Sequence, residues 1–144
     1  MKIYADTSVL FSLYVTDANS PKADAWRQAN PVPLDFTGFH RLELRNALGL
    51  AVFQQRLTPA ESRAAWQEVE QDLAAGVLVA QSDLWEKLVR EAESLAEQHT
   101  PAIGSRSLDI LHVAAALVLG ATEFCTLDTR QGKLAQLAGL KVQP

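Results

Sequence analysis

The chain has 144 residues, of which 48% are apolar, so it is long and apolar enough to form one domain with a buried core, and a disordered chain is excluded. Its formal net charge of −4 excludes a protein that coats nucleic acid through a generally basic surface, but it is compatible with an enzyme that has a local basic rim. Its single cysteine, Cys125, excludes an intrachain disulfide and lies in an apolar run, where we expect a buried, inert thiol.

The features that bear on cellular location favour the cytoplasm. The N-terminus has one lysine and then reaches Asp6 almost at once, which is unlike a secretory signal. The longest apolar stretch, residues 110–121, contains His112 and Gly120 and is shorter than the roughly 20 residues that span a bilayer. We therefore expect a cytoplasmic protein without membrane contact.

Apolar runs and helical stretches alternate along the chain and predict a parallel α/β fold. Gly76, Gly120 and Gly139 each follow a predicted helix and precede an apolar run, where glycine adopts the left-handed conformation that ends a helix. No linker divides residues 1–144, which are predicted to form a single domain. The predicted elements are strand 2–5, helix 7–15, helix 20–29, strand 32–36, helix 39–55, helix 58–75, strand 77–80, helix 83–98, helix 107–119, strand 123–126, helix 129–138 and strand 140–142.

Several helix ends carry recognisable signals. Thr58 and Glu61 fit a capping box with proline between them, and Ser20 before Pro21 indicates a second cap followed by proline. Ser82 or Asp83 is expected to cap the helix over 83–98. Residues 100–104 contain proline and glycine and are predicted to separate that helix from the next, which begins at Ser105 or Ser107.

Four acidic residues stand where a parallel α/β fold would bring them together: Asp6, Glu43, Asp109 and Asp128. Asp6 and Asp128 follow predicted strands, and ligands bind at the carboxyl ends of parallel strands. Glu43 and Asp109 lie near the starts of apolar helices. Because carboxylates in one crevice repel each other unless a cation compensates, the pattern predicts a metal site, and carboxylate ligands favour Mg²⁺ or Mn²⁺.

Three of these acids also have a purely structural interpretation. Asp6 and Asp128 are good N-caps, and Asp128 with Gln131 fits a capping box. Asp109 in a first helical turn interacts favourably with the helix dipole. Capping is compatible with function, because a capping carboxylate can also hold a metal-bound water.

Glu43 is harder to explain as a solvated side chain. It falls inside or beside the predicted apolar stripe of its helix, and a buried carboxylate needs a partner, for which Asn46 on the same face is a candidate. The predicted stripe consists of Phe39, Leu42, Asn46, Ala47, Leu50 and Phe53.

Other polar side chains accompany the acids. Thr7, Ser8 and Thr126 are interpreted as supporting residues that orient carboxylates or bound water. His112 lies three residues after Asp109 and therefore on the same helix face. A hard cation does not require histidine, so His112 is interpreted as a supporting or structural residue.

With these acids in place, the chain resembles the PIN-domain ribonucleases, and specifically the toxins of VapBC-type toxin–antitoxin pairs. The resemblance extends over essentially the whole chain, and all four acidic positions are filled. Its matching segments are residues 4–10, 41–48, 106–117 and 124–128. It implies an α/β fold with a central parallel sheet flanked by helices. It also implies a Mg²⁺- or Mn²⁺-dependent endoribonuclease that forms homodimers and is inhibited by a small antitoxin.

On this interpretation, Asp6 and Asp109 are the expected direct metal ligands. Glu43 and Asp128 would bind a second ion, hold metal-bound waters or orient the attacking water, and the sequence leaves one ion or two open. The resemblance implies products with a 3′-hydroxyl and a 5′-phosphate. The sequence does not identify the RNA target or the antitoxin.

Basic residues beside the acids are candidate contacts for RNA phosphates, although arginines on helix surfaces are more often simply solvated. These candidates are Arg41, Arg45, Arg106, Arg130 and Lys133. Tryptophans at positions 26, 66 and 85 are interpreted either as core residues or as part of a dimer or antitoxin surface.

Alternative functions differ in the residues they require. A receiver domain needs a second acid beside Asp6 and a lysine that ends a late strand, and neither is evident. A haloacid-dehalogenase-type phosphatase needs an aspartate where Ser8 stands. The stronger alternative is a catalytically silent PIN-like module that keeps the acids and only binds RNA or protein.

Overall fold

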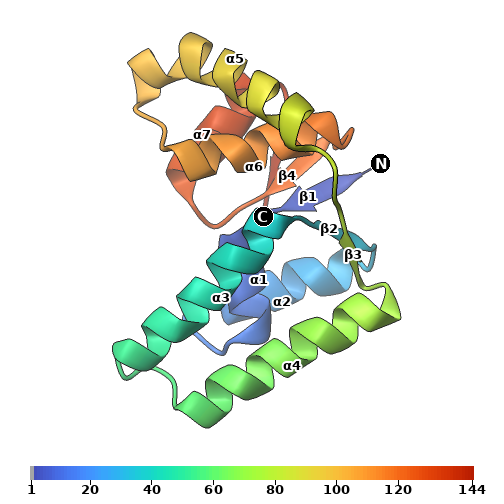
Figure 1. The fold of residues 1–144 in the computed structure, drawn as a ribbon, viewed down its shortest axis with the longest axis vertical. Coiled ribbons are helices and arrows are strands. Elements are labelled where there is room, and N and C mark those ends of the chain that lie inside the picture. Colours follow the sequence, from blue (N-terminus) through green and yellow to red (C-terminus); the bar gives the residue numbers. More distant parts are fainter. Residues whose placement is uncertain (1) are drawn as a thin grey trace. The chain divides into compact units, whose positions relative to one another are not determined.

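Residues 2–144 are described by the computed structural model and contain seven helices and five strands (Figure 1). The strands are β1 (Ile3–Ala5), β2 (Leu34–Phe36), β3 (Leu78–Ala80), β4 (Glu123–Cys125) and β5 (Lys141–Gln143). The helices are α1 (Thr7–Tyr14), α2 (Ser20–Ala29), α3 (Gly38–Phe53), α4 (Pro59–Ala75), α5 (Trp85–Ile103), α6 (Ser107–Val118) and α7 (Thr129–Leu137). Their order and type confirm the α/β class. Within residues 2–144, no helix is both long and apolar enough to cross a membrane.

The chain is organised as two compact units. One unit combines the described part of Met1–Asp6 with Ser82–Pro144, and the other is Thr7–Gln81. The second unit is therefore inserted in the sequence between the two pieces of the first. That residues 1–144 act as a single domain stays a prediction.

The first unit is built on a parallel three-stranded sheet in the order β1-β4-β5. Tyr4 and Phe124 face each other in the register of β1 and β4, are fully buried, and stack with their ring centroids 5.6 Å apart. Helices α5 and α6 pack against each other, and α7 packs against β5. Cys125 is buried, as expected. The parallel pairing places the residues after β1 and β4 at one edge of the sheet.

The second unit has a two-stranded parallel sheet of β2 and β3 with helices α1 to α4. Helices α3 and α4 lie side by side and form the hairpin drawn in cyan and green in Figure 1. The buried side chains of this unit include Leu34, Leu44, Leu48 and Val69. Burial of such side chains supplies most of the stability of a small unit.

The predicted helix signals at Thr58 and at the three glycines are confirmed. The Thr58 hydroxyl accepts from the Glu61 N–H at 3.1 Å, and the Glu61 carboxylate accepts from the Thr58 N–H at 3.0 Å, so the Thr58 backbone lowers the pKa of Glu61. Gly76, Gly120 and Gly139 all have positive φ angles, which glycine adopts without steric cost.

The predicted bounds of α2, residues 20–29, are confirmed, but the predicted cap at Ser20 was wrong. Ser20 lies inside α2, and the N-cap is Asn19, which makes no side-chain capping bond. The Ser20 hydroxyl contacts the Ser12 and Val15 carbonyls at 2.8 Å instead, because the turn before α2 brings the end of α1 within its reach.

The predicted limits of α5, residues 83–98, were wrong. No side chain caps its start, where the N-cap is Leu84, and Asp83 has a φ of 60°. The helix continues through Pro101 to Ile103 and ends at Gly104, whose φ of 65° is left-handed. Proline lies in the last turn, where it removes a single helical hydrogen bond, so glycine rather than proline ends this helix.

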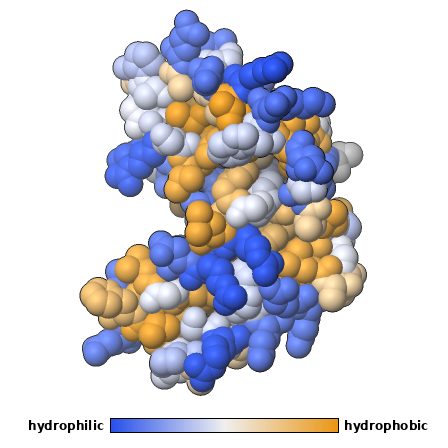
Figure 2. Space-filling view, viewed as in Figure 1, coloured by the Kyte–Doolittle hydropathy of each residue, from blue (hydrophilic) through white to orange (hydrophobic). Residues whose placement is uncertain are grey.

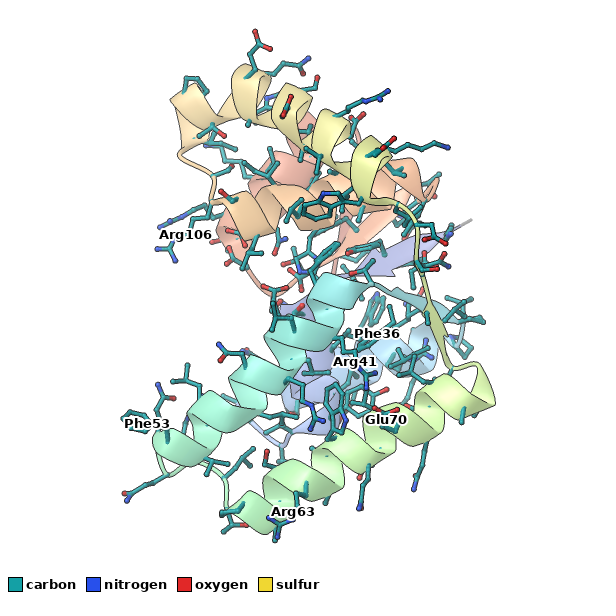
Figure 3. All side chains as sticks on the ribbon, in the orientation of Figure 1. Phe36, Arg41, Phe53, Arg63, Glu70 and Arg106 are labelled. Carbon is teal, nitrogen blue, oxygen red and sulfur yellow. The ribbon has the colours of Figure 1, made fainter. Side chains whose placement is uncertain are left out.

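The buried face of α3 is not the predicted stripe. His40, Leu44, Leu48 and Ala51 are its buried residues, because their spacing of three or four residues places them on one face, toward the neighbouring helices. Four members of the predicted stripe are exposed instead: Asn46, Leu42 by 69%, Leu50 by 47% and Phe53 by 84%. Figure 2 shows apolar residues at the end of α3, where Figure 3 labels Phe53.

A cavity of about 240 Å³ opens within residues 7–81. The hydroxyl of Tyr14 at its wall donates to Asp72 at 2.5 Å, and burial together with this carboxylate raises the pKa of Tyr14. Its lining residues are Leu10, Leu13, Tyr14, Asp24, Arg27, Leu34, Glu68, Asp72, Val77 and Leu78. None of the four acids singled out in the sequence lines it.

Candidate active site

Asp6 and Thr126 lie together at the carboxyl edge of the three-stranded sheet. Ala5 and Cys125 are paired in register, so the residues that follow them, Asp6 and Thr126, are neighbours. The Asp6 N–H donates to the Cys125 carbonyl at 3.0 Å, and the Thr126 hydroxyl donates to Asp6 Oδ2. Asp6 is only 1% exposed. A buried carboxylate requires such donors, so Thr126 holds Asp6 in a defined orientation.

Asp128 is tied to the same hydroxyl and also begins α7. Its backbone N–H donates to Thr126 Oγ1 at 3.0 Å. Its Oδ1 accepts from the backbone N–H groups of Arg130 at 2.8 Å and Gln131 at 3.1 Å, which confirms the predicted N-cap. Oδ2 of this exposed residue has no hydrogen-bond partner within residues 2–144. Capping thus occupies one oxygen and leaves the other open to a ligand.

The predicted capping box of Asp128 and Gln131 does not form. Instead, Nε2 of Gln131 donates to the backbone carbonyl of Asp109 at 3.2 Å. Asp109 is half-buried in the first turn of α6, whose following residues are buried nearly all round, as predicted. The side chain of Gln131 turns toward α6 because α6 and α7 are packed together.

Glu43 is held by a hydroxyl within residues 7–81. Thr7 Oγ1 donates to Glu43 Oε1 at 2.8 Å, and both side chains are half-buried. Asn46, the partner considered from the sequence, is exposed. Ser8 is half-buried in the first turn of α1. The carboxylate of Glu43 is therefore oriented by the residue that directly follows Asp6 in the chain.

The chemistry of these side chains suits a hard cation. All four are carboxylates, oxygen donors of the kind that Mg²⁺ and Mn²⁺ prefer, and threonine hydroxyls orient two of them. Over the described residues, no three or more His, Cys, Asp or Glu side chains are grouped so that they could hold a metal ion. Metal ligation by these acids stays a prediction.

His112 serves the core of the first unit. It is 2% exposed, and its Nδ1 lies 2.8 Å from the hydroxyl of Tyr4, with the two rings in an edge-to-face arrangement. A buried tyrosine hydroxyl needs a hydrogen-bond partner, and the imidazole supplies one. This geometry favours the structural interpretation of His112.

The candidate RNA contacts fall into two groups. Arg106, Arg130 and Lys133 are exposed in the first unit, and Figure 3 shows Arg106 directed outward just before α6. Arg41 and Arg45 are exposed on α3 in the second unit and lie over the ring of Trp66.

Arg41 and Arg45 have partners on α4 that were not expected from the sequence. Their guanidinium carbons lie 5.0 and 4.1 Å from the centroid of the Trp66 ring, and Arg41 pairs with Glu70 at 2.6 Å (Figure 3). The sequence held one signal for these contacts. Arg41 and Arg45 are four residues apart, as are Trp66 and Glu70, so each pair lies on one face of its helix. Trp66 is buried at 7% exposure.

The other tryptophans differ from each other in exposure. Trp26 is 5% exposed and belongs to the core, whereas Trp85 is 65% exposed at the start of α5. Of the two interpretations of the tryptophans, core packing holds for Trp26 and Trp66.

Comparison with known proteins identifies both a family and a fold. Residues 3–137 match the family model described as PIN domain. FitAcB from Neisseria gonorrhoeae is 20% identical, with 99% of this chain and 96% of that chain covered and a TM-score of 0.66. VapC20 from Mycobacterium tuberculosis, described as a sarcin-ricin loop cleaving toxin, is 17% identical. The match covers 99% of this chain and 100% of that chain, with a TM-score of 0.68.

A third solved structure, of a protein from Pyrobaculum aerophilum, is 19% identical, with 99% of this chain and 83% of that chain covered and a TM-score of 0.58. At these identities the three likenesses establish a shared fold. A search of curated protein sequences finds no significant match.

Proposed function

This chain belongs to the PIN domain family, and on that premise we propose that it is a metal-dependent endoribonuclease and the toxin of a type II toxin–antitoxin pair. The observation that carries the proposal is the bonded arrangement at the carboxyl edge of the β1-β4-β5 sheet. There Thr126 contacts both the buried carboxylate of Asp6 and the backbone of Asp128. Carboxylates oriented in this way at the ends of parallel strands are suited to hold a cation and a phosphate group.

We propose that all four acids are catalytic residues. Asp6 and Asp109 would be direct ligands of Mg²⁺ or Mn²⁺, while Glu43 and Asp128 would hold a second ion or bound waters. The bond from Thr7 to Glu43 supports the inclusion of Glu43, because Thr7 directly follows Asp6. The open Oδ2 of Asp128 supports its inclusion.

The proposed reaction is hydrolysis of a phosphodiester bond. When bound, the cation would neutralise phosphate charge and lower the pKa of a water. Thr126 fixes the orientation of the Asp6 carboxylate, and a carboxylate oxygen of Asp128 or Glu43 would accept a proton from the attacking water. Attack on phosphorus with departure of the 3′-oxygen leaves a 3′-hydroxyl and a 5′-phosphate.

Protein partners are part of the same proposal. The exposed apolar side chains Leu42, Leu50 and Phe53 on α3 support binding of another protein chain, since such residues are uncommon together on a free surface. We propose a small inhibitory antitoxin and a second copy of this chain as the partners, acting in the cytoplasm. The description of VapC20 as a toxin that cleaves the sarcin-ricin loop supports the toxin role and an RNA substrate.

Cleavage of a mixed RNA pool tests the activity directly. The purified protein is expected to cut RNA with Mg²⁺ or Mn²⁺, to stop in EDTA, and to leave 5′-phosphate ends that a 5′-phosphate-dependent exonuclease degrades. Cleavage that persists in EDTA would contradict the metal-dependent reaction. RNA binding without cleavage, in protein shown to be free of an antitoxin, would favour the alternative of a silent binding module.

Arg106→Ala is expected to weaken RNA binding, because Arg106 is exposed three residues before Asp109 and is placed to contact a phosphate. Loss of one phosphate contact should reduce the slope of log affinity against log salt by about one. Arg63→Ala on the exposed surface of α4 is the matched control (Figure 3). Titration of labelled RNA in EDTA at several salt concentrations measures the affinity and its salt dependence for each variant. Equal affinities for the two variants would exclude this role for Arg106.

A further inference from the structure

We propose that Gln131 is a positioning residue that sets the spacing of Asp109 relative to Asp6 and Asp128. This inference rests on the proposed function and extends it to a residue without a carboxylate. Gln131 is 4% exposed in the first turn of α7, and its side chain crosses to α6. Gln131 would affect the reaction by fixing the positions of Asp109 and Asp128, and it would not contact RNA itself.

Gln131 makes two bonds that serve two different acids. Its backbone N–H donates to Asp128 Oδ1 at 3.1 Å, and its side-chain Nε2 donates to the Asp109 carbonyl at 3.2 Å. The Asp109 carbonyl lies in the first turn of α6, so this bond holds the backbone from which the carboxylate projects. Because a carbonyl oxygen has two lone pairs, it can accept from Gln131 as well as from within its helix.

These bonds complete a continuous connection among three acids within the first unit. The Thr126 hydroxyl donates to the Asp6 carboxylate and accepts from the Asp128 backbone N–H. The Asp128 carboxylate accepts from the Gln131 backbone N–H, and the Gln131 side-chain amide donates to the Asp109 carbonyl. The bond from Gln131 to Asp109 joins α7 to α6, and the bond from Gln131 to Asp128 lies at the start of α7. A displacement of about 1 Å at a catalytic site can lower a rate by about a hundredfold, so a link of this kind has consequences beyond stability.

A glutamine suits this position for a chemical reason. Its amide is neutral, so it adds no charge among carboxylates, and it has the length to reach α6 from the first turn of α7. Near-complete burial removes water as a competitor for the amide N–H. The alternative is that the bond to the Asp109 carbonyl only satisfies the buried amide of Gln131 and does not affect the acids. The two interpretations predict different metal affinity and activity for a variant whose side chain cannot donate this hydrogen bond.

Gln131→Met keeps the length and volume of the side chain and removes its donor. Gln131→Asn keeps the amide but shortens the side chain, and Gln136→Met, at an exposed position of the same helix, is the control. Affinity for Mn²⁺ alone would be measured by electron paramagnetic resonance of the free ion, beside thermal unfolding and the kcat and KM of RNA cleavage. Mutation of a residue that hydrogen-bonds to a metal ligand typically lowers metal affinity or activity by about tenfold to a hundredfold.

The positioning role predicts about tenfold weaker Mn²⁺ binding and a lower kcat for both Gln131 variants, with KM for RNA and the Gln136→Met control unchanged. If Gln131→Met fails to fold, the Asn variant provides the same comparison. Mn²⁺ affinity and kcat within twofold of wild type in a folded variant would overturn the inference alone. A wild-type protein that neither binds Mn²⁺ nor cleaves RNA would overturn the proposed function, and the inference with it.

Discussion

Asp6→Asn is expected to reduce metal-dependent RNA cleavage by about a hundredfold or more while the protein remains folded. Asparagine has nearly the same shape as aspartate and keeps an oxygen that can accept from Thr126, so the bond at the end of β1 can be retained. What is lost is the negative charge proposed to bind the cation. Because Asp6 is 1% exposed, a neutral side chain also avoids the cost of burying a carboxylate, and the free energy of unfolding is expected to be equal or higher.

The measurement combines initial rates of RNA cleavage in Mn²⁺ with thermal unfolding in EDTA. Asp24→Asn makes the same chemical change at an exposed position of α2 and is expected to cleave at the wild-type rate. A normal rate for Asp6→Asn would place the reaction at another site or identify a contaminating nuclease. Loss of activity with a large loss of stability would instead assign Asp6 a structural role.

The elements that were predicted correctly depend on local signals. Gly76 ends α4 because a left-handed residue is needed there, and Thr58 begins the same helix because its hydroxyl and Glu61 satisfy two backbone groups. Both requirements involve residues within a few positions of each other, so they can be read from the sequence. The same holds for Asp6 and Asp128, whose places follow from the ends of apolar runs.

The features that were missed depend on partners far along the chain. Gln131 looked like the second half of a local capping box, but its amide bonds to Asp109, 22 residues away. Arg41 was interpreted as an RNA contact, yet it also pairs with Glu70, 29 residues away. Local spacing cannot reveal a partner that the packing of another helix supplies, so neither bond could be predicted from the sequence. Contact of Arg41 with RNA stays a prediction.

The start and the buried face of α3 were missed for two other reasons. Thr37 and His40 form a reciprocal cap, with His40 Nδ1 accepting from the Thr37 N–H at 3.0 Å, but histidine replaces the usual glutamate and the signal was overlooked. The helix also carries two apolar stripes. The one through Leu44 and Leu48 is buried, and the sequence alone could not tell which would face the core.

Thr126→Val is expected to lower both stability and activity, because valine keeps the shape of threonine and removes only the hydroxyl. That hydroxyl donates to the buried carboxylate of Asp6 and accepts from the Asp128 N–H at 3.0 Å. Leaving buried polar groups unsatisfied costs about 1–3 kcal/mol of unfolding free energy. Loss of a contact that orients a proposed metal ligand adds a reduction in cleavage of about tenfold to a hundredfold.

The shape of the substitution matters because α7 packs closely against this residue. A Cβ added at Gly132 would lie 3.4 Å from Thr126 Cγ2, so the pocket around the side chain has little spare room, and valine fits where a larger residue would not. Thr126→Ser restores the hydroxyl and should recover most of the activity, while Thr122→Val at an exposed position should behave as wild type. Denaturant unfolding and cleavage rates separate the two effects. If Thr126→Val is as stable and as active as the wild type, the hydroxyl is not needed, and the orientation of Asp6 by Thr126 would have to be abandoned.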